Sequence, residues 1–557
     1  MLKRRWLTSW RLIRSGNFRE LVYRVFIFIK THFKENTVIN YEQWRKKWVE
    51  LSDEDRKQIV TKIDSLPRLP SFTFILNSKK TDIDSVDSSV RSIVNQLYPN
   101  WVLHISNSEL SESDFSDQFF SLDDMRIKHG NPDEHELGDW IVELDSKTQL
   151  HEAALFSCAV SVTGNPKAKI IYGDHDHVDS SGFFCDPHMK PDWNHDLFKS
   201  LNYLDPFIAF DKKLFETTQY ETSNRHDFLM NAIRHLEEEE ILHIPHILSS
   251  LKIKNGTEHL EPPTKRIKYE LEDPSPKVSI LIPTRDQGAM LKKCLSSIYE
   301  NTDYEDFEII LVDHETSERE AMEVIGAFAQ KSNFRVLNFS GPFNFSALMN
   351  RAAEISKGEI LVLLNNDTEI FDPEWLAELA SQVLRPEVGV VGALLLFNDG
   401  TIQHAGVHPG LNGLMGHGHK HLPSGDSGYF SRLKTVHEVA AVTGACLAIE
   451  KKTWVDVGGL DEESLPVAYN DIDLCLKVRE KNLRVVFSPY AKLFHHESVS
   501  RGIDKPIEDN KRLQGEIRTM KERWGDSLFH DPAYSPNLSK ENGSFKLSNN
   551  PVSLKTF

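Results

Sequence analysis

The second half of the chain alternates apolar runs with helix-like segments, and this alternation constrains the fold more than any other feature. Apolar runs at 278–282, 307–312 and 359–364 are separated by helix-like stretches that include 289–301 and 346–356. Strands that alternate with helices predict a mostly parallel sheet, because parallel neighbours need a crossover between them. Ligands of such sheets bind at the carboxyl ends of the strands. We therefore expect an α/β fold with a binding site at one sheet edge.

The first half repeats this order of elements less distinctly. Strand-like runs at 72–76, 101–105 and 140–144 precede a helix-like stretch at 150–160, and another strand-like run at 169–172 follows it. Two stretches with one order of elements suggest a tandem duplication of a single α/β unit, and 557 residues are enough for several domains. We expect a helical N-terminal region at 1–69, a first α/β unit at 70–250, a linker rich in proline and charge at 251–276, a second unit at 277–530 and a polar, irregular tail at 531–557.

Charge is distributed unevenly along the chain. The first 50 residues carry 12 Lys and Arg against 4 Asp and Glu, whereas the whole chain has a formal charge of -18. An acidic body argues against bulk binding of nucleic acid. Residues 17–34 have the periodicity of an amphipathic helix, and Trp6 and Trp10 lie among basic residues upstream. This pattern predicts contact with an anionic membrane surface through residues 1–35, with docking on the protein's own body and a targeting segment as alternatives.

The cysteine and hydropathy patterns indicate the cellular compartment of the protein. The five cysteines are scattered and form no Cys-x-x-Cys pair, so neither a disulfide framework nor a structural zinc site is indicated. A reducing compartment, the cytosol, fits this usage best. No run of 18 uncharged apolar residues occurs, so we predict no membrane-spanning helix. We expect a cytoplasmic protein held peripherally at the inner face of the cytoplasmic membrane.

Polar residues follow three predicted strands of the second unit. The first strand ends in Pro283, Thr284 and Arg285, the second is followed by Asp313, and the third leads into Asn365, Asn366 and Asp367. Converging carboxylate, amide and guanidinium groups predict a pocket for a charged ligand. Neither G-x-G-x-x-G after a strand nor G-x-x-x-x-G-K-[ST] occurs, so bound phosphates would need a divalent metal. An ordinary turn is the alternative for the Asn-Asn-Asp segment.

Two further clusters of polar residues lie downstream. Asp471 and Asp473 precede a helix-like stretch at 474–481, where they could cap the helix or supply a general base. His495, His496 and Glu497 follow strand-like runs at 485–488 and 490–494 and are plausible metal ligands by residue type. Arg501 could pair with phosphate oxygens.

In this order, the motifs resemble those of family-2 glycosyltransferases with the GT-A fold. The similar stretches are 278–284, 343–346 with Asn350 and Gly358, 363–367, 458–461, 470–474 and 495–502. The segment 363–367 resembles the family's metal motif in an Asn-x-Asp variant, and 495–502 is similar to the ending of bacterial enzymes that make lipopolysaccharide, O-antigen or rhamnose-containing glycans. The family more often has Glu-Asp where this chain has Asn470-Asp471, so the base is retained beside a neutral neighbour.

The resemblance implies an inverting, metal-dependent hexosyl- or deoxyhexosyltransferase. It would move a sugar from a nucleotide-diphosphate donor to a lipid-linked or lipopolysaccharide or other surface-polysaccharide acceptor. Donor-binding roles are implied for Pro283, Thr284, Arg285, Asp313, Asn350, Asn366 and Arg501. Asn365, Asp367 and His496 would hold Mg²⁺ or Mn²⁺, with Asp471 as general base and Asp473 as a supporting carboxylate.

The first unit resembles the same family more loosely. At the place of the metal motif it reads Leu144-Asp145-Ser146-Lys147-Thr148, where a second acid is missing and a lysine would repel a cation. We therefore expect a degenerate, non-catalytic copy that positions acceptor or partner. The alternative is a second active transferase that uses Asp174 and Asp176.

Other functions remain open from the residues alone. A carbohydrate-binding scaffold that has lost activity is disfavoured because Asp313, Asp367, Asp471 and His496 are all present, and a nucleotide-sugar hydrolase or pyrophosphorylase would need a different phosphate-binding loop. The His- and Gly-rich stretch at 404–421 predicts a glycine-hinged loop near the acceptor, with a zinc site as the alternative.

Overall fold

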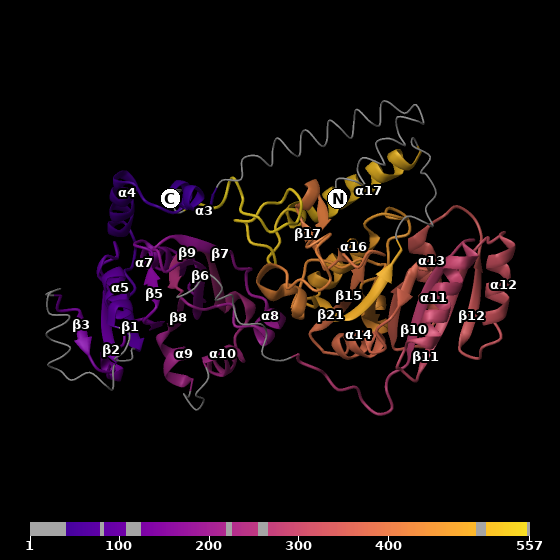
Figure 1. Cartoon of the computed structure of the whole chain (residues 1–557), viewed down its shortest axis with the longest axis horizontal. Helices are drawn as coiled ribbons and strands as arrows, with labels where there is room; N and C mark the ends of the chain where they lie inside the picture. The colour runs from indigo at the N-terminus through magenta and orange to yellow at the C-terminus, as the bar shows by residue number, and fades with distance from the viewer. Residues whose placement is uncertain are drawn as a thin grey trace.

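The computed structural model describes residues 40–77, 83–106, 124–218, 225–253, 266–496 and 508–553. The predicted amphipathic helix at 17–34, together with Arg501, lies outside these ranges. The described residues form two sheets, one from each half of the chain, and Figure 1 shows the first half on the left and the second on the right. In the part of the chain that the structure covers, no helix is long and apolar enough to cross a lipid bilayer.

The first half begins with two helices, α3 (Tyr41–Trp48) and α4 (Asp53–Asp64). Its sheet contains β1 (Phe72–Asn77), β2 (Trp101–Ser106), β3 (Ile127–His129), β4 (Trp140–Asp145), β5 (Thr148–Leu150), β6 (Ile170–Val178), β7 (Phe184–His188), β8 (Ile208–Asp211) and β9 (Ile241–Lys252). The helices between them are α5 (Ile83–Val94), α7 (Ala154–Gly164), α8 (His195–Ser200), α9 (Lys212–Thr217) and α10 (Arg225–Ile233).

The second half contains the longer helices and the larger sheet. Its principal strands are β10 (Val278–Thr284), β11 (Phe307–His314), β12 (Phe334–Phe339), β13 (Ile360–Leu364), β14 (Thr368–Ile370), β15 (Val388–Leu396), β20 (Cys446–Glu450) and β21 (Arg484–His495). Two short strands, β16 (Ile402–His404) and β19 (His437–Glu438), pair with β15 and β21. A separate hairpin consists of β17 (Val407–Pro409) and β18 (Met415–His417). The helices are α11 (Gly288–Glu300), α12 (Arg319–Phe328), α13 (Phe345–Ile355), α14 (Trp375–Val383), α15 (Lys451–Asp456), α16 (Asn470–Glu480) and α17 (Glu508–Trp524).

The two sheets have the same strand order and the same strand directions. The first runs β3-β2-β1-β4-β8-β6-β9-β5 and the second β12-β11-β10-β13-β20-β15-β21-β14. Among the eight strands of each of these two orders, the fifth and the eighth run against the others. The predicted α/β class with largely parallel sheets is therefore confirmed. A shared topology is also what a tandem duplication would produce.

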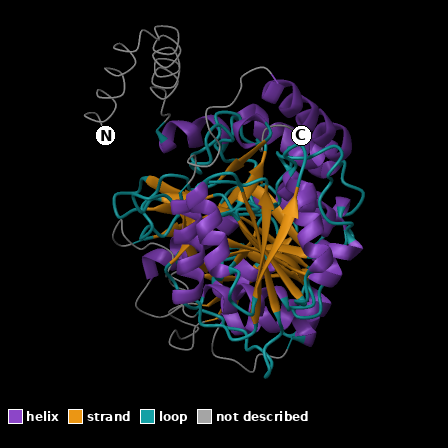
Figure 2. Cartoon of the chain, turned by 90° about the vertical axis from the view of Figure 1, so that its right-hand side faces the viewer, coloured by secondary structure: helices purple, strands orange, loops and turns teal. Residues whose placement is uncertain are grey.

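Apolar residues on both faces of the second sheet explain why it is covered by helices. Every residue of β13 and β15 is buried, so these strands read as continuous apolar runs without alternation. In Figure 2 the strands lie at the centre and the helices around them. The two runs predicted at 485–488 and 490–494 form one strand, β21, because a register shift against β15 between Ala393 and Leu394 absorbs the interruption.

The C-terminal segment joins the two halves. Residues 531–553 contain no helix or strand, as expected, but Tyr534, Leu538 and Phe545 are buried in a cluster with Trp44 of α3 and Met189 of the first half. Figure 1 shows this yellow segment passing between the two sheets near α3. The tail is therefore part of the packed body of the protein.

Candidate functional site

The donor-side residues lie at the carboxyl ends of β10 and β11. Thr284 and Asp313 are register partners at the ends of these parallel strands, and Thr284 is buried. Asn366 Nδ2 donates a 3.0 Å hydrogen bond to Thr284 Oγ1. Asp313 Oδ1 accepts from the Thr316 N–H at 3.0 Å, which holds the carboxylate at the strand end. Arg285 follows directly and is exposed.

Asn365 and Asp367 follow β13, as expected, and meet a histidine from β21. Asp367 is 4% exposed, and its Oδ1 lies 3.1 Å from His495 Nε2. Asn365 Nδ2 lies 3.3 Å from the same nitrogen. The other ring nitrogen of His495 lies 2.6 Å from Gln403 Oε1, which fixes the orientation of the imidazole. One carboxylate, one amide and one imidazole therefore converge at the sheet edge.

His496, predicted as a metal ligand, is not in this group. Its Nε2 lies 2.9 Å from Glu369 Oε2, and its Nδ1 bonds to Asn398 Oδ1. Lys293 Nζ is 2.6 Å from the same Glu369 carboxylate. Consecutive side chains of an extended segment point to opposite faces, so only one of the two adjacent histidines can face Asp367. The sequence signal, a His-His pair after a strand, could not select between them without the register of β21.

Asn365, Asp367 and His495 could hold a hard divalent cation only if a bound ligand supplied further oxygen atoms. In the described ranges no three His, Cys, Asp or Glu side chains are grouped so that they could hold a metal. Mg²⁺ and related ions are commonly held by one or two carboxylates with the remaining positions taken by water and substrate phosphates. Asp367, Asn365 and His495 meet that description, and diphosphate oxygens would complete the shell.

Asp471 lies in the first turn of α16 and is half-buried. Its Oδ2 accepts a 2.8 Å hydrogen bond from the Gly444 N–H, and its Oδ1 accepts one of 2.9 Å from the Ile472 N–H. Burial raises the pKa of this carboxyl, and the two backbone hydrogen bonds oppose the effect. Tyr469, just before the helix, has the left-handed angles φ 61° and ψ 5°, an uncommon conformation for a residue with a side chain.

A short segment connects Asp471 to the metal candidates. Leu364 and Cys446 are register partners of the antiparallel pair β13–β20. Just beyond that pair, the Asn365 N–H donates to the Ala445 carbonyl at 3.0 Å, and the neighbouring Gly444 bonds Asp471. Nothing in the sequence marks Gly444 for this role, because the contact depends on two strands that are 80 residues apart. The candidate base and the candidate metal ligands thus flank one turn of backbone.

Two other predicted site residues have structural partners instead. Asp473 is fully buried, and its Oδ1 accepts from Arg523 Nη1 at 2.8 Å and Trp524 Nε1 at 2.9 Å, both on α17. Asn350 on α13 exchanges hydrogen bonds of 2.9 and 3.0 Å with the backbone of Leu460. The structure does not bring either side chain to Asp367. Pro283 lies within β10 opposite Val312, and its side chain is half-buried.

In the first half, Asp174 and Asp176 are fully buried, and both carboxylates accept hydrogen bonds from other segments of the chain. Asp176 accepts from Tyr41 at 2.5 Å and from Arg45 Nε at 3.0 Å, which fastens α3 to β6. Asp174 accepts from His243 Nε2 at 2.9 Å and from Asn537 Nδ2 at 3.2 Å, which fastens the tail. These contacts hold segments of the chain together, and burial leaves no access for a substrate.

The His- and Gly-rich stretch at 404–421 is packed. His404 Nδ1 lies 2.9 Å from His417 Nδ1, and His408 Nδ1 lies 2.7 Å from Asp531 Oδ2 in the tail. His419 Nε2 accepts from the Tyr429 N–H at 3.1 Å. His404, His408 and His419 therefore serve as buried hydrogen-bonding groups around the hairpin β17–β18, and the pair to Asp531 was not anticipated from the sequence.

Comparison with known proteins finds similarity that includes the second half of the chain. Residues 279–431 match the sequence model of glycosyl transferase family 2. The chain is 39% identical over 451 residues to the uncharacterized protein y4gI of Sinorhizobium fredii (74% of this chain, 50% of that protein). It is 31% identical over 441 residues to the O-antigen biosynthesis protein RfbC of Myxococcus xanthus (72% and 34%). The chain thus spans half, or less, of the length of these curated relatives.

One solved structure is similar at a lower level. The crystal structure of GalNAc-T7 with UDP, GalNAc and Mn²⁺ has a TM-score of 0.36 at 16% identity, over 45% of this chain and 48% of that chain.

Proposed function

We propose that this chain, whose residues 279–431 match the sequence model of glycosyl transferase family 2, transfers a sugar from a nucleotide-diphosphate donor to a hydroxyl group of a glycan acceptor. The observation that carries the proposal is the position of Asp471. Its carboxylate is fixed by Gly444, next to the residue that bonds Asn365. Transfer of a sugar to a hydroxyl group requires a base that lies beside the edge where the diphosphate binds.

The donor would bind along the ends of β10, β11 and β13. In our proposal Asp313 and Thr284 contact the nucleoside, with Asp313 on the base, and exposed Arg285 reaches the same ligand. Asn366 orients Thr284 through their 3.0 Å hydrogen bond. Strand-end residues of neighbouring parallel strands support this role because their side chains share one sheet edge.

Asn365, Asp367 and His495 would hold a divalent cation, Mg²⁺ or Mn²⁺, against the diphosphate. When bound, the cation supplies neutralising charge for the leaving nucleoside diphosphate. His495 replaces His496 in this set because the His495 ring contacts the Asp367 carboxylate, whereas the His496 ring contacts Glu369.

Asp471 would accept the proton of the attacking acceptor hydroxyl. Burial, which raises its pKa, strengthens it as a base relative to an exposed aspartate. Attack from the side of Asp471, opposite the leaving diphosphate, would invert the anomeric centre. Asp473 acts only indirectly in this scheme, because its bonds to Arg523 and Trp524 fix α16 against α17.

A screen of nucleotide sugars tests the assignment. Thermal unfolding of the full chain is measured with each donor, with and without Mn²⁺, because a ligand that binds only the folded state raises the midpoint. We expect one donor to give metal-dependent protection. Failure of every nucleotide sugar, and of the free nucleoside diphosphates, to protect would contradict the proposal.

We further propose that the acceptor belongs to a surface polysaccharide, such as a lipid-linked O-antigen precursor. The 31% identity to an O-antigen biosynthesis protein supports this choice. The basic segment 1–35 would hold the enzyme at the anionic inner face of the membrane, where a lipid-carried acceptor is found. Co-sedimentation with anionic vesicles should fall strongly when residues 1–35 are removed, and unchanged sedimentation would refute membrane attachment.

A further inference from the structure

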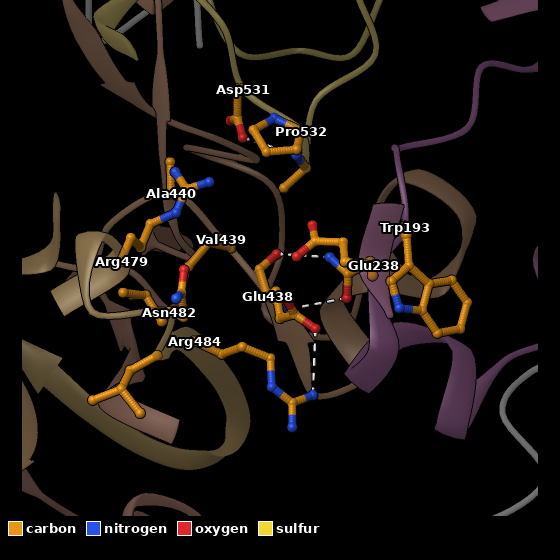
Figure 3. A pocket seen from close by; sticks show the side chains of 14 residues that line it. Trp193, Glu238, Glu438, Val439, Ala440, Arg479, Asn482, Arg484, Asp531 and Pro532 are labelled. Atoms are coloured by element: carbon orange, nitrogen blue, oxygen red, sulfur yellow. Dashed lines mark hydrogen bonds and ion pairs between the residues drawn. The ribbon is translucent and has the colours of Figure 1, made fainter. Parts of the chain in front are cut away.

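A pocket of about 170 Å³ lies where the two halves of the chain meet. Trp193 and Glu238 contribute from the first half, Glu438, Arg479 and Asn482 from the second, and Pro532 from the tail. Figure 3 shows Arg479 and Asn482 on the side opposite Trp193 and Glu238. We name this space the junction pocket.

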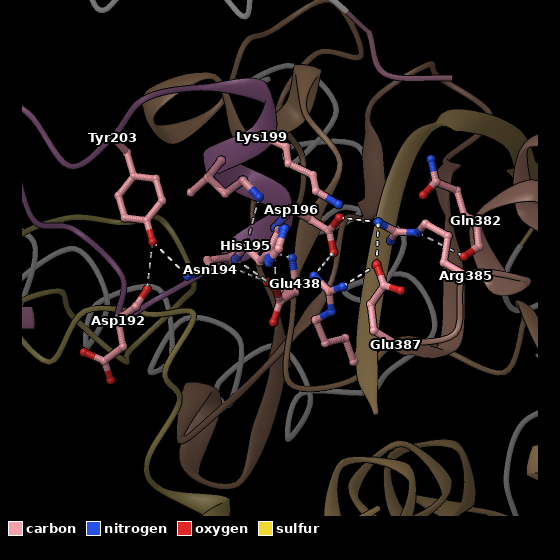
Figure 4. A network of polar contacts seen from close by, with 12 residues as sticks. Asp192, Asn194, His195, Asp196, Lys199, Tyr203, Gln382, Arg385, Glu387 and Glu438 are labelled. Atoms are coloured by element: carbon pink, nitrogen blue, oxygen red, sulfur yellow. Dashed lines mark hydrogen bonds and ion pairs between the residues drawn. The ribbon is translucent and has the colours of Figure 1, made fainter. Parts of the chain in front are cut away.

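The walls of the junction pocket are fixed by contacts between the halves. Asn194 Nδ2 donates to the Glu438 carbonyl at 2.9 Å, and Glu438 Oε1 accepts from the His195 N–H at 2.9 Å. Behind them, Asp196 pairs with Arg385 at 2.5 Å and with Arg484 at 3.1 Å (Figure 4). A preformed site of this kind loses little conformational freedom when a ligand binds.

Several polar side chains in the pocket make no hydrogen bond in the described part of the chain. The Arg479 guanidinium forms neither a hydrogen bond nor a close ion pair there, in contrast to Arg484 and Arg385, and its charge acts on Asp531 in the same wall. The side chains of Asn482 and Glu238 and the indole N–H of Trp193 likewise make no hydrogen bond among these residues. Together they offer donors and acceptors on both sides of the pocket, one of which also carries an aromatic ring.

These groups match the chemistry of a sugar. Hydroxyl groups both donate and accept, so they can satisfy a guanidinium, an amide and a carboxylate at once. The apolar face of a sugar ring can lie on an indole, whose N–H remains free for a polar partner. The volume is below the roughly 300–1,000 Å³ of pockets for drug-sized ligands, which suits a single sugar ring.

We propose that the junction pocket binds one sugar unit of an extended glycan acceptor, at a distance from the transfer site. This inference rests on the proposed transferase function. Helix α16 carries Asp471 in its first turn and Arg479 of the pocket near its end. At about 1.5 Å per residue, the two positions lie roughly 12 Å apart along the helix. A single sugar ring cannot reach both, so the pocket would select for acceptors of more than one sugar unit and give the first half a role in acceptor binding.

The test measures glycan binding directly, without a donor. Neutral oligosaccharides built from rhamnose or galactose, and oligosaccharides that contain uronic acid, are titrated into the full chain and followed by saturation-transfer NMR. We expect at least one of these probes to bind and Arg479→Ala to weaken that binding by about tenfold or more, a loss of about 1.4 kcal/mol. Trp193→Ala should do the same, whereas Trp193→Phe, which retains a ring, should recover part of the affinity.

Arg518→Ala is the matched control, because Arg518 is an exposed arginine on α17 away from the pocket. If Trp193→Ala lowers the unfolding temperature, exposed Asn482→Ala replaces it. Absence of binding by all the probes, or binding equally strong in the Arg479 and Trp193 or Asn482 variants, would overturn the junction pocket proposal. Thermal protection by nucleotide sugars and nucleoside diphosphates is measured in parallel. Glycan binding that is sensitive to Arg479 in a chain that none of these ligands protects would refute the transferase and leave the sugar site standing.

Discussion

The backbone N–H of Gly444 donates a 2.8 Å hydrogen bond to the carboxylate of Asp471. The next residue, Ala445, accepts from the N–H of Asn365 at 3.0 Å. One stretch of backbone therefore fixes the position of the candidate base relative to the candidate metal ligands. This arrangement underlies most of the predictions that follow.

Asp471→Asn should abolish sugar transfer while donor binding persists. The amide keeps an oxygen for the Gly444 N–H but cannot accept a proton, and loss of a general base costs about 10²–10⁴-fold in rate. Transfer is measured as nucleoside diphosphate released in the presence of acceptor, and donor binding as Mn²⁺-dependent thermal protection. Asp456→Asn, at an exposed position of α15, is the control and should retain full activity. Normal turnover in the Asp471 variant would refute its assignment as the base.

Asp367→Asn should remove the metal-dependent part of donor binding. The change deletes the only negative charge among Asn365, Asp367 and His495, and hard cations prefer carboxylate oxygens. Thermal protection by the nucleotide sugar should then be equal with Mn²⁺ and with a chelator. Protection that still depends on Mn²⁺ would show that the cation is held elsewhere.

His495→Ala and His496→Ala distinguish the two adjacent histidines. His495 Nε2 lies 3.1 Å from Asp367, whereas His496 is 2.9 Å from Glu369. We expect His495→Ala to raise the Mn²⁺ concentration needed for half-maximal transfer by about 10–100-fold, as for loss of a metal-site partner. His496→Ala should leave that concentration nearly unchanged. The reverse order would restore His496 as the ligand and would mean that the segment rearranges when the donor binds.

Arg385→Ala should destabilise the protein by about 3 kcal/mol. Removing one partner of a buried pair leaves an uncompensated charge, and Arg385 and Asp196 are 5% and 2% exposed. The loss stays near the lower end of the usual range because Arg484 still lies 3.1 Å from Asp196 (Figure 4). The loss in free energy of unfolding is measured by urea unfolding followed by circular dichroism. Arg518→Ala, at an exposed site, should change the free energy of unfolding by less than about 0.5 kcal/mol, and an equal loss in both variants would contradict a role for the buried pair.

Glu438→Gln should flatten the pH dependence of stability between about pH 5 and pH 8. Burial, with the nearby Asp196 charge, raises the pKa of Glu438 from 4.5 to about 8. A raised pKa means that the folded state retains a proton that the unfolded chain loses. The stabilisation it gives is complete below about pH 4.5 and is lost as the pH rises through 8. Urea unfolding at several pH values should show the wild type falling relative to the variant over this range, and parallel profiles would contradict the assignment.

The strands of the second half could be predicted because their signal is local. Runs such as 278–282 and 359–364 are uninterrupted apolar segments bounded by polar residues, and β10 and β13 match them within two residues. The position of Thr284, Asp313 and Asp367 at strand ends on one sheet edge also followed from the alternation of strands and helices. The packing of the tail could not be predicted, because Tyr534 and Phe545 bury their rings against residues of both halves that are distant in sequence.

By itself, the sequence determined the α/β alternation, the strand ends that bear Thr284, Asp313 and Asp367, and the family of the second half. These are properties of short segments, which depend on hydrophobic periodicity and on the residues that follow each run. Only the tertiary structure decided that the ring of His495 and not that of His496 faces Asp367, that Asp473 bonds to α17, and that Asp174 and Asp176 are buried anchors. Each of these depends on the register and packing of segments far apart in the chain, which no local pattern encodes.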